Sequence, residues 1–286
     1  MKRGKSRRLF KKKKSHSNQR LGCIIAIIVL IPICYGLYLY YQQYSVQHSS
    51  KPQIETSVSL PTPSGKDLEI PVSLIPRQEQ IIRHKGYTVS YNKDLKIPNW
   101  VSYELTRQET KGKEKRGDNF IADPLVKADY ARSGYDKGHM APAADMKWSP
   151  DVMKESFYFS NMCPQHPQLN RRGWKNLEEK IRDWAVADSA VILLCGPFID
   201  KPSKTIGKNK VAVPERFFKV ILSPFVKPAR GIGFLFNNRQ AVEPLSTYAV
   251  SIDSIEKLTH MDFFSPLPDE IENAVEANAD YYQWPR

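Results

Sequence analysis

One apolar stretch stands out because it contains no charged residue from Leu21 to Tyr41. A helix over these 21 residues would be ~30 Å long, which matches the hydrocarbon core of a bilayer. Four tyrosines lie at its C-terminal end, where an aromatic belt forms at the membrane surface: Tyr35, Tyr38, Tyr40 and Tyr41. The pattern predicts one N-terminal transmembrane helix over residues 21–41.

The residues before this stretch predict its orientation. Residues 1–20 contain ten Lys and Arg and no acid, so the positive-inside rule predicts a basic cytoplasmic tail. A cleaved signal peptide is the alternative, but its apolar region is only about 7–15 residues long and ends in small residues. We therefore expect an uncleaved anchor. The rest of the chain would be extracytoplasmic, at the periplasmic or outer face of a bacterial inner membrane.

The pattern changes again after the anchor. Residues 42–76 are rich in Gln, Ser and Pro and have no sustained apolar period, which predicts an extended stalk. Residues 77–286 have the length and apolar content of one folded domain.

Within the domain, several runs are rich in β-branched and aromatic residues and are bounded by Pro, Gly or Asn, which predicts strands. They lie at residues 86–92, 156–162, 190–196, 217–222 and 231–236. A helix is predicted over residues 174–185, where four apolar residues recur at helical spacing: Trp174, Leu177, Ile181 and Trp184. A second, acidic helix is predicted near residues 268–280. Because strands and helices do not alternate regularly, we expect an α+β fold.

The charge and composition of the chain exclude several classes of protein. The formal net charge is +13, but without residues 1–20 it is 33 bases against 30 acids, or +3. The basic character therefore belongs to the tail and is no evidence that the domain binds nucleic acid. With 41% hydrophobic residues, a wholly disordered or collagen-like chain is excluded. Cys163 and Cys195 lie in or beside predicted strands, and both a disulfide and two buried thiols stay open.

Candidate chemistry lies in two segments. Residues 134–146, GYDKGHMAPAADM, place Asp, Lys and His139 around a glycine, and Asn170 follows about 30 residues later at the start of the predicted helix. A histidine can take a proton from water, and an Asn oxygen is a hard ligand suited to Mg²⁺, although Asn alone could also cap the helix. Glu178, at the rim of the apolar helix face, could reach a metal-bound water. The pattern is typical of metal-assisted hydrolysis.

The strings YDKGHMAPAADM, SNMCPQ and QLNRRGWKNLEE, in this order, resemble the DNA/RNA non-specific endonucleases of the ββα-metal (His-Me finger) type. The resemblance covers roughly residues 77–268. It implies an α+β fold with a mixed sheet core and a ββα-metal active site. It also implies DNA and RNA as substrates, Mg²⁺ as cofactor with Mn²⁺ as the alternative, and a homodimer as an open question.

The resemblance also implies roles for single residues. His139 becomes the general base, Asn170 the metal ligand, and Glu178 the residue that holds a metal-bound water. Lys137 stands where the family usually has Arg. It keeps the positive charge but lacks the planar guanidinium group, which can bind a phosphate through two hydrogen bonds. Arg116 is the candidate for an upstream arginine that contacts phosphate.

Four further residues are candidates for substrate binding. Arg171 and Arg172 lie beside Asn170 and could contact phosphates, or could simply be an exposed helix start. Asn161 and Gln165 could line the substrate groove or satisfy backbone groups.

The hypothesis is a membrane-anchored, Mg²⁺-dependent endonuclease that hydrolyses DNA and RNA without marked preference. One alternative is a phosphodiesterase on the same fold with a narrower substrate. Another is a non-catalytic protein for DNA binding or uptake.

Overall fold

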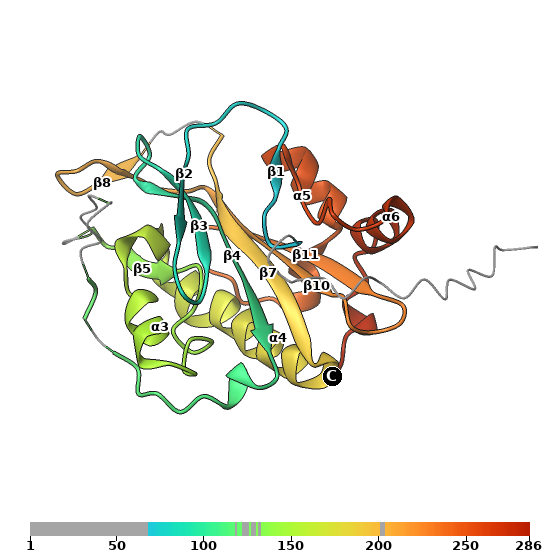
Figure 1. Cartoon of the computed structure of the whole chain (residues 1–286). Helices are drawn as coiled ribbons and strands as arrows, with labels where there is room; N and C mark the ends of the chain where they lie inside the picture. Colours follow the sequence, from blue (N-terminus) through green and yellow to red (C-terminus); the bar gives the residue numbers. More distant parts are fainter. Residues whose placement is uncertain (1–67, 118, 122–125, 127–129, 131–132, 201–203) are drawn as a thin grey trace, which may run out of the picture. The chain divides into compact units, whose positions relative to one another are not determined.

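The computed structural model describes residues 68–117, 119–121, 126, 130, 133–200 and 204–286. Its central element is a seven-stranded sheet with the order β12-β11-β10-β7-β4-β3-β2 (Figure 1). The strands are β2 (Gln80–Arg83), β3 (Thr88–Asn92), β4 (Ile97–Thr106), β7 (Ala190–Phe198), β10 (Arg216–Ser223), β11 (Arg230–Asn237) and β12 (Ala249–Val250). Three two-stranded pairs accompany it: β1 (Val72–Ser73) with β13 (Met261–Asp262), β5 (Asp136–His139) with β6 (Met162–Gln165), and β8 (Thr205–Ile206) with β9 (Val211–Ala212).

The α+β class is confirmed, but the expectation of a mixed sheet is wrong, because every pair of neighbouring strands in this sheet is antiparallel. The pairing of β4 with β7 shows why. Thr106, the last residue of β4, lies opposite Ala190, the first residue of β7. The connection 107–189 thus leaves and returns at the same end of the sheet, which makes the two strands antiparallel. This connection carries all of the predicted site residues.

The sheet is covered on both faces, so its central strands are almost continuously apolar. Phe234 of β11 stacks on Trp184 of α4 (Lys175–Asp188), with 6.2 Å between ring centroids. A Cβ on the preceding residue, Gly233, would instead lie 2.6 Å from Ile255 of α5 (Ile252–Thr259). Because successive strand residues point to opposite faces, α4 covers one face and α5 covers the other. The helix α6 (Asp269–Glu276) packs against α5 and β11 (Figure 1).

Four predicted strands, at residues 86–92, 190–196, 217–222 and 231–236, are confirmed by β3, β7, β10 and β11. The two predicted helices, 174–185 and 268–280, are confirmed by α4 and by the shorter α6. The predicted strand at 156–162 is wrong, because its residues form turns and the 3-10 helix η2 (Phe159–Asn161) before β6 begins. Ser156 and Asn161 bind nearby carbonyl groups through their side chains, which competes with strand pairing.

The remaining helices are short: η1 (Glu109–Lys111), α3 (Pro150–Glu155), η3 (Leu169–Trp174), η4 (Leu245–Tyr248) and η5 (Tyr281–Gln283). The stalk was predicted to reach residue 76, but Val72 pairs with Asp262, so the folded domain begins earlier. Two-residue strands have no periodicity that a sequence could reveal.

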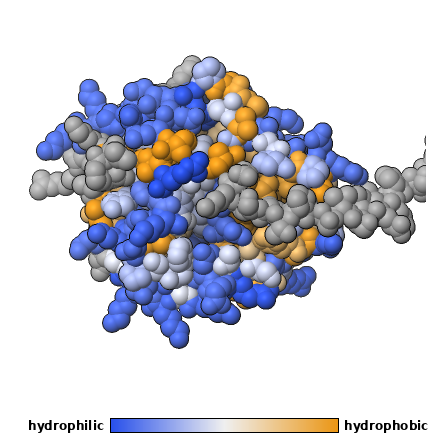
Figure 2. All heavy atoms as spheres, in the orientation of Figure 1, coloured by the Kyte–Doolittle hydropathy of each residue, from blue (hydrophilic) through white to orange (hydrophobic). Residues whose placement is uncertain are grey.

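Figure 2 shows a face that is mostly hydrophilic with apolar patches between, as in most folded proteins.

The predicted tail and anchor, residues 1–20 and 21–41, lie outside the described residues, as does the predicted stalk up to residue 67. Among the residues that are described, no helix is both long enough and apolar enough to cross a membrane.

Cys163 and Cys195 are both buried free thiols, so of the two possibilities that the sequence left open, the disulfide is not formed.

Candidate active site

Two strands and a helix frame the site. The strands β5 and β6 pair antiparallel, with His139 opposite Met162. The chain then enters η3, a π-helix, which continues directly into α4. Trp174, at the junction, donates a hydrogen bond from Nε1 to the His139 carbonyl oxygen at 3.3 Å. This bond ties the strand pair to the helix, so the segment has the ββα arrangement that the resemblance implied.

A cleft of about 1000 Å³ lies between β5 and the start of α4. It brings together all five residues predicted for catalysis and metal binding, together with Arg171, although they come from distant positions. Those that line it are Arg116, Lys137, His139, Asn170, Arg171 and Glu178.

The imidazole of His139 is buried beside the cleft. Its side chain is only 9% exposed, and Nε2 has no hydrogen-bond partner among the described residues. Phe157 meets the imidazole edge-on, with ring centroids 5.1 Å apart. Burial lowers the pKa of His139 to about 3; the charge of Arg116 adds to this shift, and a hydrogen bond with the Lys137 backbone opposes it. The imidazole is therefore neutral at neutral pH, which is the state a general base requires.

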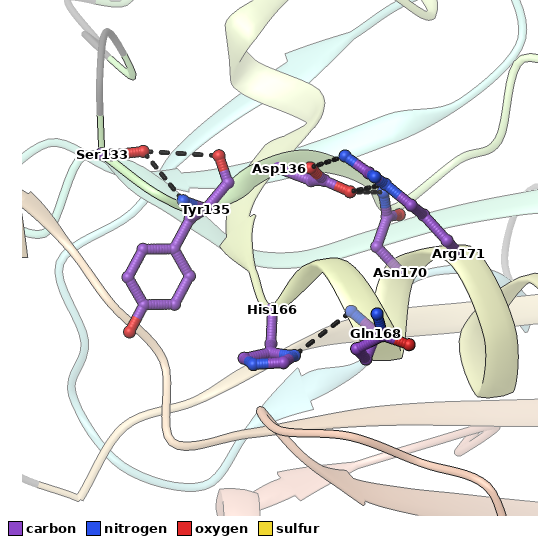
Figure 3. Close-up of polar contacts among 7 residues, drawn as sticks. All are labelled: Ser133, Tyr135, Asp136, His166, Gln168, Asn170 and Arg171. Carbon is purple, nitrogen blue, oxygen red and sulfur yellow. Dashed lines mark hydrogen bonds and ion pairs between the residues drawn. The ribbon is translucent and has the colours of Figure 1, made fainter.

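Asp136 holds the side chain of Asn170 in one orientation. Its Oδ2 accepts a hydrogen bond from Asn170 Nδ2 at 2.9 Å (Figure 3). The carboxylate also accepts two bonds from Arg171, from Nε and Nη2, each 2.8 Å long. Because the amide nitrogen of Asn170 is engaged, its carbonyl oxygen is the atom left for a hard cation.

The π-helix changes how Asn170 relates to Glu178. At 3.6 residues per turn throughout, Glu178 would lie about 80° away from Asn170 around the helix axis. In η3 the hydrogen bonds span i to i+5, so each residue turns through a smaller angle and this offset shrinks. Both side chains line the same cleft. A π-turn at this point is consistent with the enrichment of such turns at functional sites.

Comparison with known proteins identifies the family. A family model described as DNA/RNA non-specific endonuclease matches residues 64–270. The chain belongs to this family. It is 30% identical to a nuclease of Nostoc sp. over 80% of this chain and 88% of that protein. It is 32% identical to human mitochondrial endonuclease G over 66% of this chain and 71% of that protein.

The fold agrees with this assignment. The crystal structure of the EndoG/EndoGI complex, which concerns EndoG inhibition, matches with a TM-score of 0.62 and 29% identity. The match covers 68% of this chain and 89% of the solved one. The protein is therefore a nucleic-acid-hydrolysing enzyme of the non-specific endonuclease family.

Three residues predicted to bind substrate in this endonuclease do not line the cleft. Asn161 is fully buried, and its amide is satisfied by the backbone of Ala141 and Ser156. Gln165 is also fully buried, on β6. Arg172 is exposed but lies outside the cleft lining. Asn161 therefore satisfies backbone groups, which is one of the two roles that the sequence left open, and neither buried amide lines the cleft.

Arg171 differs from its prediction in another way. It lies at the cleft, but Asp136 accepts hydrogen bonds from Nε and Nη2 along one edge of its guanidinium, so this edge holds Asp136 rather than a phosphate. Its side chain is otherwise well exposed. The sequence could not reveal this pairing, because the two residues are 35 positions apart.

Arg182 is a cleft residue that the sequence reasoning missed. Its Nη1 donates a 2.8 Å hydrogen bond to Asp145, which is 1% exposed and also accepts one from Tyr103. A signal was available, because Arg182 follows Glu178 by four residues and so lies on the same side of α4.

Lys219 is the second residue that was missed. It is completely buried in β10, and its Nζ lies 4.4 Å from the centroid of the Trp174 ring. The signal was a single lysine within the apolar run 217–222. Burial raises the pKa of Glu178 to about 7, and the negative charge of Asp145 adds to this rise. Among the charges that lower the pKa of Glu178, that of Lys219 has the largest effect.

Aromatic side chains form one wall of the cleft. Tyr130 and Phe159 stack with centroids 5.6 Å apart and an interplanar angle of 12°. Lys137 places its Nζ 4.1 Å from the centroid of the Phe120 ring, which keeps the ammonium at the cleft. The cleft thus combines positive charge with flat apolar surface.

Proposed function

We propose that this nuclease hydrolyses phosphodiester bonds of both DNA and RNA, with His139 as general base and one divalent metal ion bound through Asn170. The observation that carries the proposal is the cleft itself. It places a neutral imidazole, whose Nε2 has no hydrogen-bond partner in the described part of the chain, in the same cavity as an amide whose nitrogen is already engaged by Asp136.

His139 would take a proton from the water that attacks phosphorus. Its lowered pKa means that the imidazole is neutral across the neutral range, so a ring nitrogen has a free lone pair to receive that proton. Lys137 and Arg116 place positive charge at the same cleft, where they would neutralise the phosphate oxygens as charge develops. The family resemblance implies cleavage of the bond to the 3′-oxygen, with 5′-phosphate and 3′-hydroxyl ends as products.

The oxygen donors at the cleft fit a hard divalent cation. Asn170 would supply a direct ligand, and Glu178 would accept a hydrogen bond from a water of the ion. Mg²⁺ is the expected ion and Mn²⁺ the alternative. When bound, it would supply charge stabilisation at the phosphate and at the departing oxygen.

Indifference to sequence follows from the kind of groups at the cleft. Charged side chains contact the phosphate backbone, which carries no direct sequence information. Phe159, which lines the cleft and is only partly buried, offers a flat ring on which any base could rest. We therefore propose that substrates are selected by access to the cleft rather than by base or sugar.

The test is a cleavage assay on the purified full chain with supercoiled plasmid and total RNA, in Mg²⁺ or in EDTA. We expect Mg²⁺-dependent loss of both substrates. The variant His139→Ala should lose turnover but keep DNA binding and thermal stability. His260→Asn is the matched control, because His260 lies at the end of α5 with a left-handed backbone that Asn also tolerates.

Other outcomes separate the alternatives. Cleavage of small model diesters with both polymers intact would favour the narrower phosphodiesterase. Binding of DNA without any cleavage would favour a non-catalytic protein. Near-normal cleavage by His139→Ala would overturn the proposed mechanism.

We further propose that residues 21–41 anchor this nuclease in a membrane, with residues 1–20 cytoplasmic and the catalytic domain extracytoplasmic. The support is the uncharged 21-residue stretch and the basic segment before it. A bacterial inner membrane, with the domain at its periplasmic or outer face, is the expected location. A homodimer stays a prediction from the family resemblance.

A further inference from the structure

We propose that this nuclease has a second cation site, between α5 and α6, which binds a hard divalent ion of the Ca²⁺ class. Three carboxylates form it: Asp253 and Glu256 on α5, and Glu276 at the end of α6. One oxygen from each lies within 4.8 Å of the others. The site lies on the face of the sheet opposite α4, so it is distinct from the catalytic cleft.

Glu276 is the observation that points to a ligand. Its side chain is only 6% exposed and is aimed at the pair of acids on α5. Its Oε1 is buried and has no hydrogen-bond partner among the described residues. A buried carboxylate without a partner is costly, so this group requires either a proton or a cation.

The surroundings favour a cation. The charged groups that act on Glu276 are four further acids: Glu256, Glu272, Asp262 and Asp253. None of the ion pairs formed between described residues includes any of these five. A divalent ion bound between these carboxylates would offset their mutual repulsion.

The fold holds the three ligands in place. Asp253 and Glu256 are three residues apart on α5 and so share one side of the helix. Glu256 Oε1 accepts a 2.7 Å hydrogen bond from the Phe263 backbone N–H, which restricts its side chain and leaves the other oxygen available. Gly231 lets α6 approach the sheet closely, since a Cβ there would lie 2.5 Å from the Val275 carbonyl oxygen, one residue before Glu276.

The ligand chemistry selects the ion. Carboxylate oxygens alone suit Ca²⁺, which accepts six to eight oxygens in flexible geometry and can complete its shell with water. The cluster offers neither thiolate nor imidazole, so a zinc site is not expected. By linking α5 to α6, the ion would stabilise the C-terminal part of the domain.

The test is thermal unfolding of the full chain in detergent, stripped with EDTA and then given Ca²⁺ or Mg²⁺. To silence the catalytic cleft, the protein carries Asn170→Ala. Millimolar Ca²⁺ should raise the unfolding midpoint by about 5–10 °C, as expected for an ion well above its dissociation constant. Mg²⁺, which demands stricter geometry, should raise it less.

Two variants assign the effect to this site. Glu276→Gln and Asp253→Asn should each remove most of the Ca²⁺-dependent shift, whereas Glu270→Gln, an exposed acid on the same helix, should keep it. In the background with intact Asn170, Glu276→Gln should cleave plasmid at the normal rate in saturating Mg²⁺. If Glu276→Gln does not fold, the Ca²⁺-dependent shift is measured in Asp253→Asn alone, because Asp253 is only partly buried.

Two results would overturn the proposal. One is the absence of any Ca²⁺-dependent shift in the parent protein, which would mean that protons alone neutralise the cluster. The other is a shift that survives both Glu276→Gln and Asp253→Asn, which would place the ion elsewhere. Neither result bears on nuclease activity, so the catalytic proposal is tested separately.

Discussion

Asp136 Oδ2 accepts a hydrogen bond of 2.9 Å from Asn170 Nδ2, and this single contact decides which end of the amide is available to a cation. An amide without this contact could turn either its oxygen or its NH₂ group toward the ion, and only the oxygen can act as a ligand. Arg171 clamps the same carboxylate through two bonds, so Asp136 is itself held in place. Asp136 is therefore a positioning residue for the proposed metal site.

The first prediction concerns this contact. Asp136→Ala should weaken Mg²⁺ binding by about 10–100-fold, as is typical when a partner of a metal ligand is removed. The dependence of cleavage on Mg²⁺ concentration measures it, and excess Mg²⁺ should restore most of the rate. Asp151→Ala, an exposed acid on α3, is the control. An unchanged Mg²⁺ dependence in Asp136→Ala would contradict the assigned role.

The second prediction concerns pH. Because burial raises the pKa of Glu178 to about 7, this carboxyl is partly protonated at neutral pH without a metal ion. The ionised form is the one that would hold a metal-bound water, so Mg²⁺ affinity should fall as the pH drops below 7. Titrations with Mg²⁺ at pH 6, 7 and 8 should show this trend, and Glu178→Gln should flatten it. A trend that persists in Glu178→Gln would assign the titration to another group.

The third prediction concerns Lys219. Its charge lowers the pKa of Glu178, so Lys219→Met should raise that pKa and move the pH dependence of Mg²⁺ affinity to higher pH. Stability should be unchanged or higher, because a buried ammonium that finds no hydrogen-bond acceptor among the described residues is replaced by an apolar side chain of similar size. Urea unfolding and the same Mg²⁺ titrations check the two effects, with the exposed Lys208→Met as control. Loss of stability without a pH shift would show that Lys219 acts only through packing against Trp174.

The fourth prediction concerns topology. If residues 21–41 span the membrane with residues 1–20 inside, protease added outside intact spheroplasts should digest the catalytic domain. A cytoplasmic marker protein in the same cells should remain intact. Protection of the domain until the membrane is dissolved would reverse the proposed orientation.

Much of the fold was predictable where one residue pattern dominated. The apolar runs 190–196, 217–222 and 231–236 became the central strands, because both faces of the sheet are covered and nearly every side chain in them is buried. The run 156–162 looked similar but formed turns, since Ser156 and Asn161 bind carbonyl groups nearby. Local side-chain bonds of this kind are invisible in a hydrophobic pattern.

The sequence by itself singled out the candidates for chemistry: His139, Asn170 and Glu178 were proposed from residue type, spacing and the family resemblance. Only the tertiary structure decided their partners. It paired Asp136 with Asn170 and Arg171, buried Asn161 and Gln165 away from the cleft, and placed Lys219 beneath Trp174. The physical reason is that residue type and local spacing set what a side chain can do, whereas hydrogen-bond partners, burial and pKa depend on which distant segments pack beside it.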